Sequence, residues 1–294
     1  MATFGEGISM IIDRLWEAVE TGGPVCLGLD PAPELLPEGC ADRYENMAQA
    51  YWAFNKAIVD ATLDVVACYK VQIAHYEALG LVGLACYRDT LRYIRKHQAI
   101  VIGDVKRGDI GSTATYYAQA HFQGDFEADF LTLNPMLGSD AVAPFLQHLE
   151  SGEKGTFFLV RTSNPGAQEF QELPSLGKPL YLHVAERVWA WGERFLGRCG
   201  YSSVGAVVGA SPQVLSTVRR AFPHMCLLVP GYGAQGASAQ DVAPAFRDRN
   251  GAVIVAARSI LGAHRGKPDG AKNFADYARH AALAMRAEIQ QCLE

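Results

Sequence analysis

The sequence predicts an α/β fold in which all 294 residues form one (β/α)8 barrel, also called a TIM barrel. Eight short apolar runs rich in β-branched residues recur along the chain, and helix-like stretches lie between them. Strands that are apolar at every position are typical of a parallel sheet covered on both faces. Eight strand–helix units in a chain of this length favour a closed barrel over an open, doubly wound sheet.

The strands are predicted where β-branched runs end in Gly, Pro, Asn or a charged residue, as in PVCLGLD and QAIVIGDVK. The eight predicted strands are 24–30, 64–72, 98–106, 129–135, 155–164, 204–210, 226–231 and 251–260. Helices are predicted where apolar residues recur at helical spacing between these runs. The clearest are 45–62, 78–98, 181–197, 211–222 and a closing helix at 274–294.

Two segments do not belong to the regular alternation. Residues 1–20 have the pattern of an amphipathic N-terminal helix, and they lack the cationic start and continuous apolar run of a signal peptide. The longest gap separates the fifth and sixth predicted strands, and we interpret residues 164–203 as an insertion within the single domain.

The composition excludes several classes of partner. Hydrophobic residues make up 49% of the chain, which is enough for a large core, and the net charge of -5 argues against nucleic acid or an anionic membrane as a partner. No apolar run approaches the ~18 residues of a membrane-spanning helix. The seven cysteines include no C-x-x-C pair and no metal-ligand spacing, so we expect reduced thiols, no metal site and a cytoplasmic protein.

Polar residues follow the predicted strands, where a barrel places its catalytic groups. Any one of them has a structural explanation, since Asp30 before Pro31 could cap a turn and Lys70 could extend its amine to solvent. Their convergence on one barrel mouth instead predicts an active site. The strand-end residues that the argument uses are Asp30, Lys70, Asp104, Lys106, Ser163, Gln235 and Arg258.

The stretch IGDVKRGDIGSTA, residues 102–114, carries the densest charge. Asp104 and Lys106 are two residues apart on a strand, so both face the barrel mouth, where Lys70 of the neighbouring strand joins them. Asp109 lies just beyond the strand and could face elsewhere, including another subunit. Alternating carboxylates and ammonium groups hold one another ionised, which gives a preorganised charge array without a metal.

The glycine-rich run VPGYGAQGA, residues 229–237, formally matches G-x-G-x-x-G. A dinucleotide domain usually opens with this turn, whereas here only one predicted strand follows it. We therefore favour a phosphate cradle built by the last two strand–helix loops and Arg258 over the site of an NADP-dependent oxidoreductase.

These residues resemble the orotidine 5′-phosphate decarboxylase family. Its signature D-x-K-x-x-D-I-x-x-T is matched by Asp104, Lys106, Asp109, Ile110 and Thr113. The resemblance extends over nearly the whole chain. It includes an Asp at the end of the first predicted strand, a Lys in the second strand, Ser-x-Pro-Gly after the fifth strand, the P-G-x-G-A-Q-G loop and the Arg of the eighth strand. The motif DVKRGDIGSTA and the length of the chain resemble those of the longer bacterial subfamily.

The resemblance implies a reaction and four catalytic residues. Orotidine 5′-monophosphate would lose carbon dioxide to give UMP in pyrimidine biosynthesis, without a metal or cofactor. Lys106 would protonate the pyrimidine carbon, and Asp104 would lie beside the substrate carboxylate. Lys70 would contact the ribose and orient Asp104, and Asp109 would complete the array from the other subunit of a homodimer.

The resemblance also implies the residues that bind the nucleotide. Asp30 would bond the ribose hydroxyls, and Ser163 the amide edge of the pyrimidine. Ile110 and Thr113 would accompany Asp109 across the dimer. Gln235 and Arg258 would hold the phosphate, with a backbone N–H near Ala257.

Two alternatives remain open on the same barrel. A magnesium-dependent decarboxylase or aldolase of sugar phosphates, such as 3-keto-gulonate 6-phosphate decarboxylase, shares D-x-K-x-x-D but has an acidic residue on the second strand. Lys70 occupies that place here, and its ammonium would repel the metal. A non-catalytic nucleotide-phosphate binding barrel is the other, although an idle charge array of this kind would only cost stability.

Overall fold

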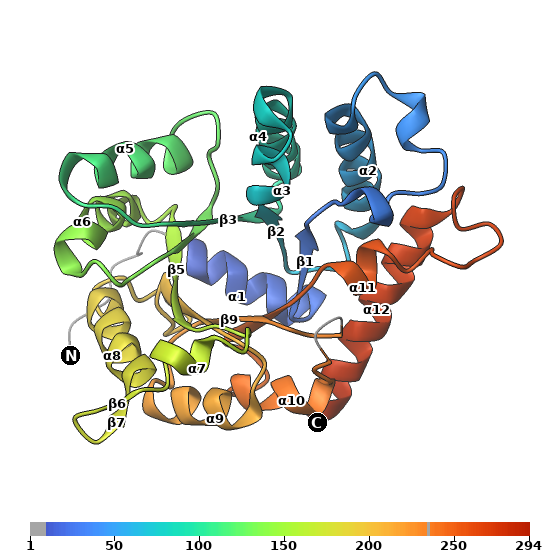
Figure 1. The fold of residues 1–294 in the computed structure, drawn as a ribbon. Helices are drawn as coiled ribbons and strands as arrows, with labels where there is room; N and C mark the ends of the chain where they lie inside the picture. The colour runs from blue at the N-terminus through green and yellow to red at the C-terminus, as the bar shows by residue number, and fades with distance from the viewer. Residues whose placement is uncertain (1–9, 234–235) are drawn as a thin grey trace.

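The computed structural model describes residues 10–233 and 236–294, and it confirms the closed parallel barrel (Figure 1). Its strands are β1 (Val25–Leu29), β2 (Cys68–Gln72), β3 (Ile100–Arg107), β4 (Phe130–Leu133), β5 (Gly155–Arg161), β8 (Val204–Val208), β9 (Leu227–Pro230) and β10 (Ala252–Ala256). Each pairs with its neighbours in the order β1-β10-β9-β8-β5-β4-β3-β2, so all eight predicted strands are present.

The helices follow the strands around the outside of the barrel (Figure 1). The longer ones are α1 (Ile11–Gly22), α2 (Met47–Thr62), α4 (Gly80–Lys96), α5 (Gly111–Phe122), α6 (Ser139–His148), α8 (Leu180–Gly192), α9 (Pro212–Ala221) and α12 (Phe274–Cys292). The single-turn helices are α3 (Ala74–Glu77), α7 (Ala167–Phe170), α10 (Ala239–Val242) and α11 (Arg258–Leu261). Short 3₁₀ turns lie at Pro33–Leu35, Ala41–Arg43, Leu149–Ser151 and Ala243–Ala245.

The predicted N-terminal helix is present as α1, and the first nine residues of its predicted range lie outside the described part of the chain. Its apolar face, made of Ile11, Ile12, Leu15 and Val19, packs against the inward side chains of the strands. Because the interior of a small barrel is filled by side chains, α1 completes that core at the end remote from the strand carboxyl termini.

Residues 164–203 contain two different kinds of structure. The helix α8 packs against β5 and β8, so it is the regular helix of the fifth strand–helix unit. The material added to the barrel is α7 and an antiparallel hairpin of β6 (Pro174–Ser175) and β7 (Lys178–Pro179). Figure 1 shows this addition beside α8. The addition is therefore narrower than the predicted insertion, whose range included a helix that the barrel itself requires.

Two irregularities of the sheet lie close to the strand carboxyl ends. The register between β3 and β4 shifts between Gly103 and Arg107, and that between β5 and β8 shifts between Leu159 and Arg161. Such irregularities re-aim side chains at the rim of a barrel. They fall on the two strands that carry Asp104, Lys106 and, just beyond β5, Ser163.

No helix in the described ranges is long and apolar enough to cross a membrane. Within the same ranges, no group of three or more His, Cys, Asp or Glu side chains is arranged to hold a metal ion.

Burial makes His121 of α5 a source of acid sensitivity. Burial and the charge of Arg107 lower its pKa from 6.5 to about 4. Below pH 6.5 the unfolded chain gains a proton here that the folded chain refuses until about pH 4. This group should therefore remove about 3 kcal/mol from the free energy of unfolding as the pH falls across that window.

Urea unfolding between pH 7 and pH 4 measures this effect. The variant His121→Phe should lose less stability over the window than the wild type, whereas replacement of the exposed His280 by Gln should leave the wild-type slope. Equal slopes for His121→Phe and the wild type would contradict the assignment.

Candidate active site

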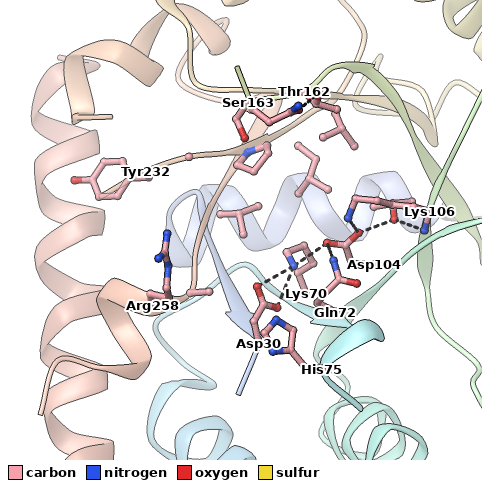
Figure 2. Close-up of a pocket in the computed structure, with 18 of the residues that line it drawn as sticks. Asp30, Lys70, Gln72, His75, Asp104, Lys106, Thr162, Ser163, Tyr232 and Arg258 are labelled. Carbon is pink, nitrogen blue, oxygen red and sulfur yellow. Dashed lines mark hydrogen bonds and ion pairs between the residues drawn. The ribbon is translucent and has the colours of Figure 1, made fainter. Parts of the chain in front are cut away.

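The carboxyl ends of the strands surround a cavity of about 480 Å³. Seven of the predicted site residues line it: Asp30, Lys70, Asp104, Lys106, Ser163, Ala257 and Arg258. Figure 2 shows Lys106 and Arg258 at opposite ends of the pocket, with Thr162 and Ser163 on the side facing Asp30 and His75. One end of the pocket therefore carries the cation of Arg258, and the other carries the charged cluster that includes Lys106. A substrate lying between them would be held at both ends.

The charged cluster is built around the carboxylate of Asp104 (Figure 2). Lys70 Nζ lies 2.9 Å from Asp104 Oδ2, and Lys106 Nζ lies 2.5 Å from Asp104 Oδ1. Lys70 Nζ also lies 3.2 Å from Asp30 Oδ1. Register explains these contacts, because β1, β2 and β3 are neighbours and Gln72 of β2 is aligned with Asp104 of β3.

The pKa values of the two buried members are set by opposing effects. Burial raises the pKa of Asp104, but the charges of Lys70 and Lys106 together lower it by more than burial raises it. The pKa of Asp104 therefore lies well below its usual range. Burial lowers the pKa of Lys70, but Asp104 and Asp30 raise it above its ordinary value. Both groups are therefore ionised at neutral pH, and each depends on the other for that state.

Lys106 differs from Lys70 in exposure and in backbone conformation. Its side chain is 46% exposed, whereas that of Lys70 is 7% exposed, so the ammonium of Lys106 is the more accessible of the two to a ligand. Its φ of 47° places a non-glycine residue in the left-handed region. This conformation costs energy and persists only where neighbouring contacts enforce it.

Thr132 of β4 supplies such contacts and was not predicted from the sequence. Its hydroxyl donates to Asp104 Oδ1 at 2.8 Å and accepts from the backbone N–H groups of Val105 (3.0 Å) and Lys106 (3.1 Å). One side chain therefore fixes both the carboxylate and the strained backbone beside it. The sequence does show a polar threonine within the apolar run FLTLNP. The register shift that brings this side chain to Lys106 cannot be recognised from the sequence.

Gln72 and His75 are two further side chains that the sequence analysis missed. Gln72 Nε2 donates to Asp104 Oδ2 at 3.0 Å, and His75 Nδ1 lies 2.8 Å from the carbonyl oxygen of Pro31, next to Asp30. Gln72 follows Lys70 by two residues on one strand, so strand alternation could have placed it on the same face.

Three predicted residues lie outside the cavity, and a fourth cannot be placed. Asp109, Ile110 and Thr113 do not line the pocket of the single chain. Asp109 Oδ1 accepts from the backbone N–H of Ile110 at 2.8 Å, and Ile110 is 59% exposed. Within one chain, the fourth charged member of the cluster is Asp30, and the expected contribution of Asp109 from a second subunit stays a prediction. Gln235 lies outside the described residues.

The fold and this site define a (β/α)8-barrel protein with a buried Lys–Asp–Lys cluster at one end of its pocket and an arginine at the other. The model of the Orotidine 5′-phosphate decarboxylase / HUMPS family matches residues 23–272. The chain belongs to this family.

Relatives with that name cover almost the whole chain. An orotidine 5′-phosphate decarboxylase of Clostridium perfringens is 49% identical over 286 residues, which span 97% of this chain and 99% of the relative. One of Petrotoga mobilis is 48% identical over 284 residues, or 96% and 98% of the two chains. The solved OMP decarboxylase of Leishmania donovani superposes with a TM-score of 0.75 at 30% identity, covering 97% of this chain and 99% of that one.

The contacts of Thr132 lead to a stability prediction. Thr132→Val keeps the shape of the side chain but leaves two backbone N–H groups without their acceptor and removes one of the two donors to Asp104 Oδ1. Such groups cost about 1–3 kcal/mol each when unsatisfied, so we expect a loss of at least that size in the free energy of unfolding. Thr132→Ser retains the hydroxyl and should lose less. Urea unfolding of both variants measures these losses. Equal stability of Thr132→Val and the wild type would refute the stabilising role of the Thr132 hydroxyl.

Proposed function

We propose that this chain converts orotidine 5′-monophosphate into UMP and carbon dioxide, the reaction named for its relatives and a step of pyrimidine biosynthesis. The observation that carries the proposal is the Lys70–Asp104–Lys106 cluster, with contacts of 2.9 and 2.5 Å. It places a fixed ammonium beside a carboxylate that stays ionised. An arginine lies at the opposite end of the same pocket.

The chemistry requires stabilisation of a carbanion. When the bond between the pyrimidine carbon and the carboxylate breaks, its electron pair stays on the ring carbon, and carbon dioxide leaves. No adjacent carbonyl delocalises that charge. The Lys106 ammonium stabilises it electrostatically as it develops and then donates a proton to the same carbon, which gives UMP and a neutral amine that solvent reprotonates.

The other members of the cluster hold Lys106 in place for this step. Asp104 orients its ammonium through the 2.5 Å contact and is itself fixed by Lys70 and Thr132. Because these groups are already paired before substrate arrives, little reorganisation is needed during the reaction.

The remaining pocket residues suit the rest of a nucleotide. Asp30, bonded to Lys70 at the rim, would receive the ribose hydroxyls, and Ser163 on the opposite side would bond the amide edge of the pyrimidine. Arg258 and the backbone near Ala257 would hold the phosphate, together with Gln235. Phosphate binding far from the reacting carbon supplies energy that orients the substrate.

The donor set opposes the magnesium-dependent alternative. Both carboxylates of the cluster, those of Asp30 and Asp104, bond the Lys70 ammonium. A divalent cation needs carboxylate oxygens free of such a competitor and is repelled by the ammonium itself. The non-catalytic alternative must explain a costly buried charge cluster that would have no task in it.

We also propose that the protein is a homodimer whose subunits share their sites. Large apolar side chains are exposed on α4, on α5 and in the loops that follow β3 and β4: Leu81, Val82, Ile110, Tyr116, Met136 and Leu137. The contact of 2.7 Å between Arg107 Nη2 and Glu77 Oε1 ties the end of β3 to α3, which precedes α4. Exposed large apolar side chains of this kind suit an interface between subunits. Asp109, Ile110 and Thr113 would enter the partner's pocket from it.

We place the protein in the cytoplasm. The cysteines at 26, 40, 68, 86, 199, 226 and 292, all in the described ranges, are free thiols, as a reducing compartment favours.

Replacement of Lys106 tests the proposed role of its ammonium. The decrease in ultraviolet absorbance of orotidine 5′-monophosphate should follow addition of the wild-type protein and should be lost with Lys106→Ala, because the proton donor is gone. UMP affinity should fall much less. Turnover by this variant at the wild-type rate would refute the mechanism.

Two control experiments distinguish the proposed metal-free decarboxylation from its alternatives. Arg258→Ala should mainly raise KM, because it removes phosphate binding and not the proton donor. Excess EDTA should leave wild-type turnover unchanged, whereas complete loss would favour the magnesium-dependent alternative. UMP binding by a wild-type protein that shows no turnover would favour the non-catalytic one.

Mixing two inactive variants tests the shared site. Lys106→Ala and Asp109→Ala should each be inactive alone. In a randomly reassorted mixture, half of the dimers contain both variants, and one site of each such dimer carries neither lesion. Activity should therefore recover to about a quarter of the wild-type value. A mixture that remains as inactive as its components would show that each site is built from one chain.

A further inference from the structure

The segment added between β5 and α8 is fastened to the end of β5. We define the strap as residues 166–179, which comprise α7 and the β6–β7 hairpin. At its base, Tyr181 N–H donates to the Gln171 carbonyl at 2.8 Å, and Leu180 N–H donates to the Leu173 carbonyl at 2.9 Å. These bonds join the strap to the start of α8, so its position is set by a regular helix of the barrel.

Gln171 of the strap grips Thr162, the first residue after β5. Gln171 Oε1 accepts from the backbone N–H of Thr162 at 2.8 Å, and Gln171 Nε2 donates to its hydroxyl at 3.0 Å. The last pairing between β5 and β8 joins Arg161 to Val208, so Thr162 lies beyond the ladder. The side chain of Gln171 thus supplies the acceptor that a neighbouring strand would otherwise provide.

The residues on either side of Thr162 are held as well. Arg161 bonds Glu172 of the strap through Nη2 at 2.6 Å and Nε at 3.1 Å, and its Nη1 donates to the Thr162 carbonyl at 2.7 Å. The Thr162 hydroxyl bonds Asn164 Oδ1 at 2.6 Å. The peptide group on each side of Thr162 therefore has a fixed partner.

Gly209 supports Ser163 from behind. A Cβ at Gly209 would lie 2.8 Å from Ser163 Cα and 2.9 Å from Ser163 N, distances that real side chains do not adopt. The backbone of Ser163 therefore rests directly on the end of β8. Gln171 on one side and Gly209 on the other leave Ser163 exposed toward the cavity in a defined position.

We infer that Gln171 is a positioning residue that fixes Ser163 for recognition of the pyrimidine, and that this is the task of the strap. The inference rests on the proposed function, because the pyrimidine role of Ser163 belongs to it. Gln171 itself does not line the cavity, so it acts through Thr162. Its loss should weaken binding of the base and spare the ribose phosphate, whose proposed partners Asp30 and Arg258 follow other strands, β1 and β10.

The test compares two ligands that differ by the pyrimidine. Binding of UMP and of ribose 5-phosphate is measured by calorimetry for the wild type and Gln171→Ala. The matched control is Gln168→Ala, which removes the same side chain from an exposed position on α7. Gln171→Glu keeps an acceptor for the Thr162 N–H and serves as the conservative variant.

We expect Gln171→Ala to weaken UMP binding roughly tenfold, as the loss of one well-made hydrogen bond would, and to change ribose 5-phosphate binding less than about twofold. Gln168→Ala should match the wild type with both ligands, and Gln171→Glu should recover most of the UMP affinity. In turnover assays, KM should rise more than kcat falls.

Wild-type UMP affinity in Gln171→Ala would overturn the inference. An equal loss for both ligands would overturn it too, because it would indicate general damage to the barrel. The proposed function fails separately, if the wild type binds UMP but does not consume orotidine 5′-monophosphate. In that case the preferential loss of UMP binding would still support a positioning role for Gln171.

Discussion

The site depends on one physical constraint, which is that the carboxylate of Asp104 is buried and must be paired. Two ammonium groups meet it, Lys70 at 2.9 Å and Lys106 at 2.5 Å, and they hold its pKa well below the usual range against the effect of burial. Removal of either lysine would take away one of the two charges that compensate this buried carboxylate. The closed barrel meets this constraint because it sets β1, β2 and β3 side by side with their carboxyl ends at one mouth.

The barrel alone does not finish the pocket, because Lys106 and Ser163 lie where the strand ladder becomes irregular or stops. At each such point a side chain from another element completes the backbone hydrogen bonding. Thr132 does so for Val105 and Lys106, and Gln171 does so for Thr162. Both are neutral, and both also bond a polar side chain of the segment that they hold. Precision at the mouth is therefore supplied by residues that need not touch the substrate.

The pocket combines this rigid cluster with parts that lie further apart. Arg258 and Lys106 lie at opposite ends of the pocket, as the proposed binding of a nucleotide between them requires. Asp109 lies outside the pocket of one chain, on a surface with exposed apolar side chains. A second subunit would bury that surface and complete the charge array in one event, which links the proposed assembly to the proposed catalysis.

The sequence by itself determined the eight strands, their closure into a barrel, and the face shared by Asp104 and Lys106, because strand alternation and continuous apolar runs are local properties. It also placed Asp30, Lys70, Ser163 and Arg258 at strand ends, and these residues do line one cavity. Only the tertiary structure decided that Thr132 reaches Lys106, that Asp30 bonds Lys70, and that the strap grips Thr162. Those contacts depend on register shifts and on loops that return to distant strands, and no local pattern of residues encodes either.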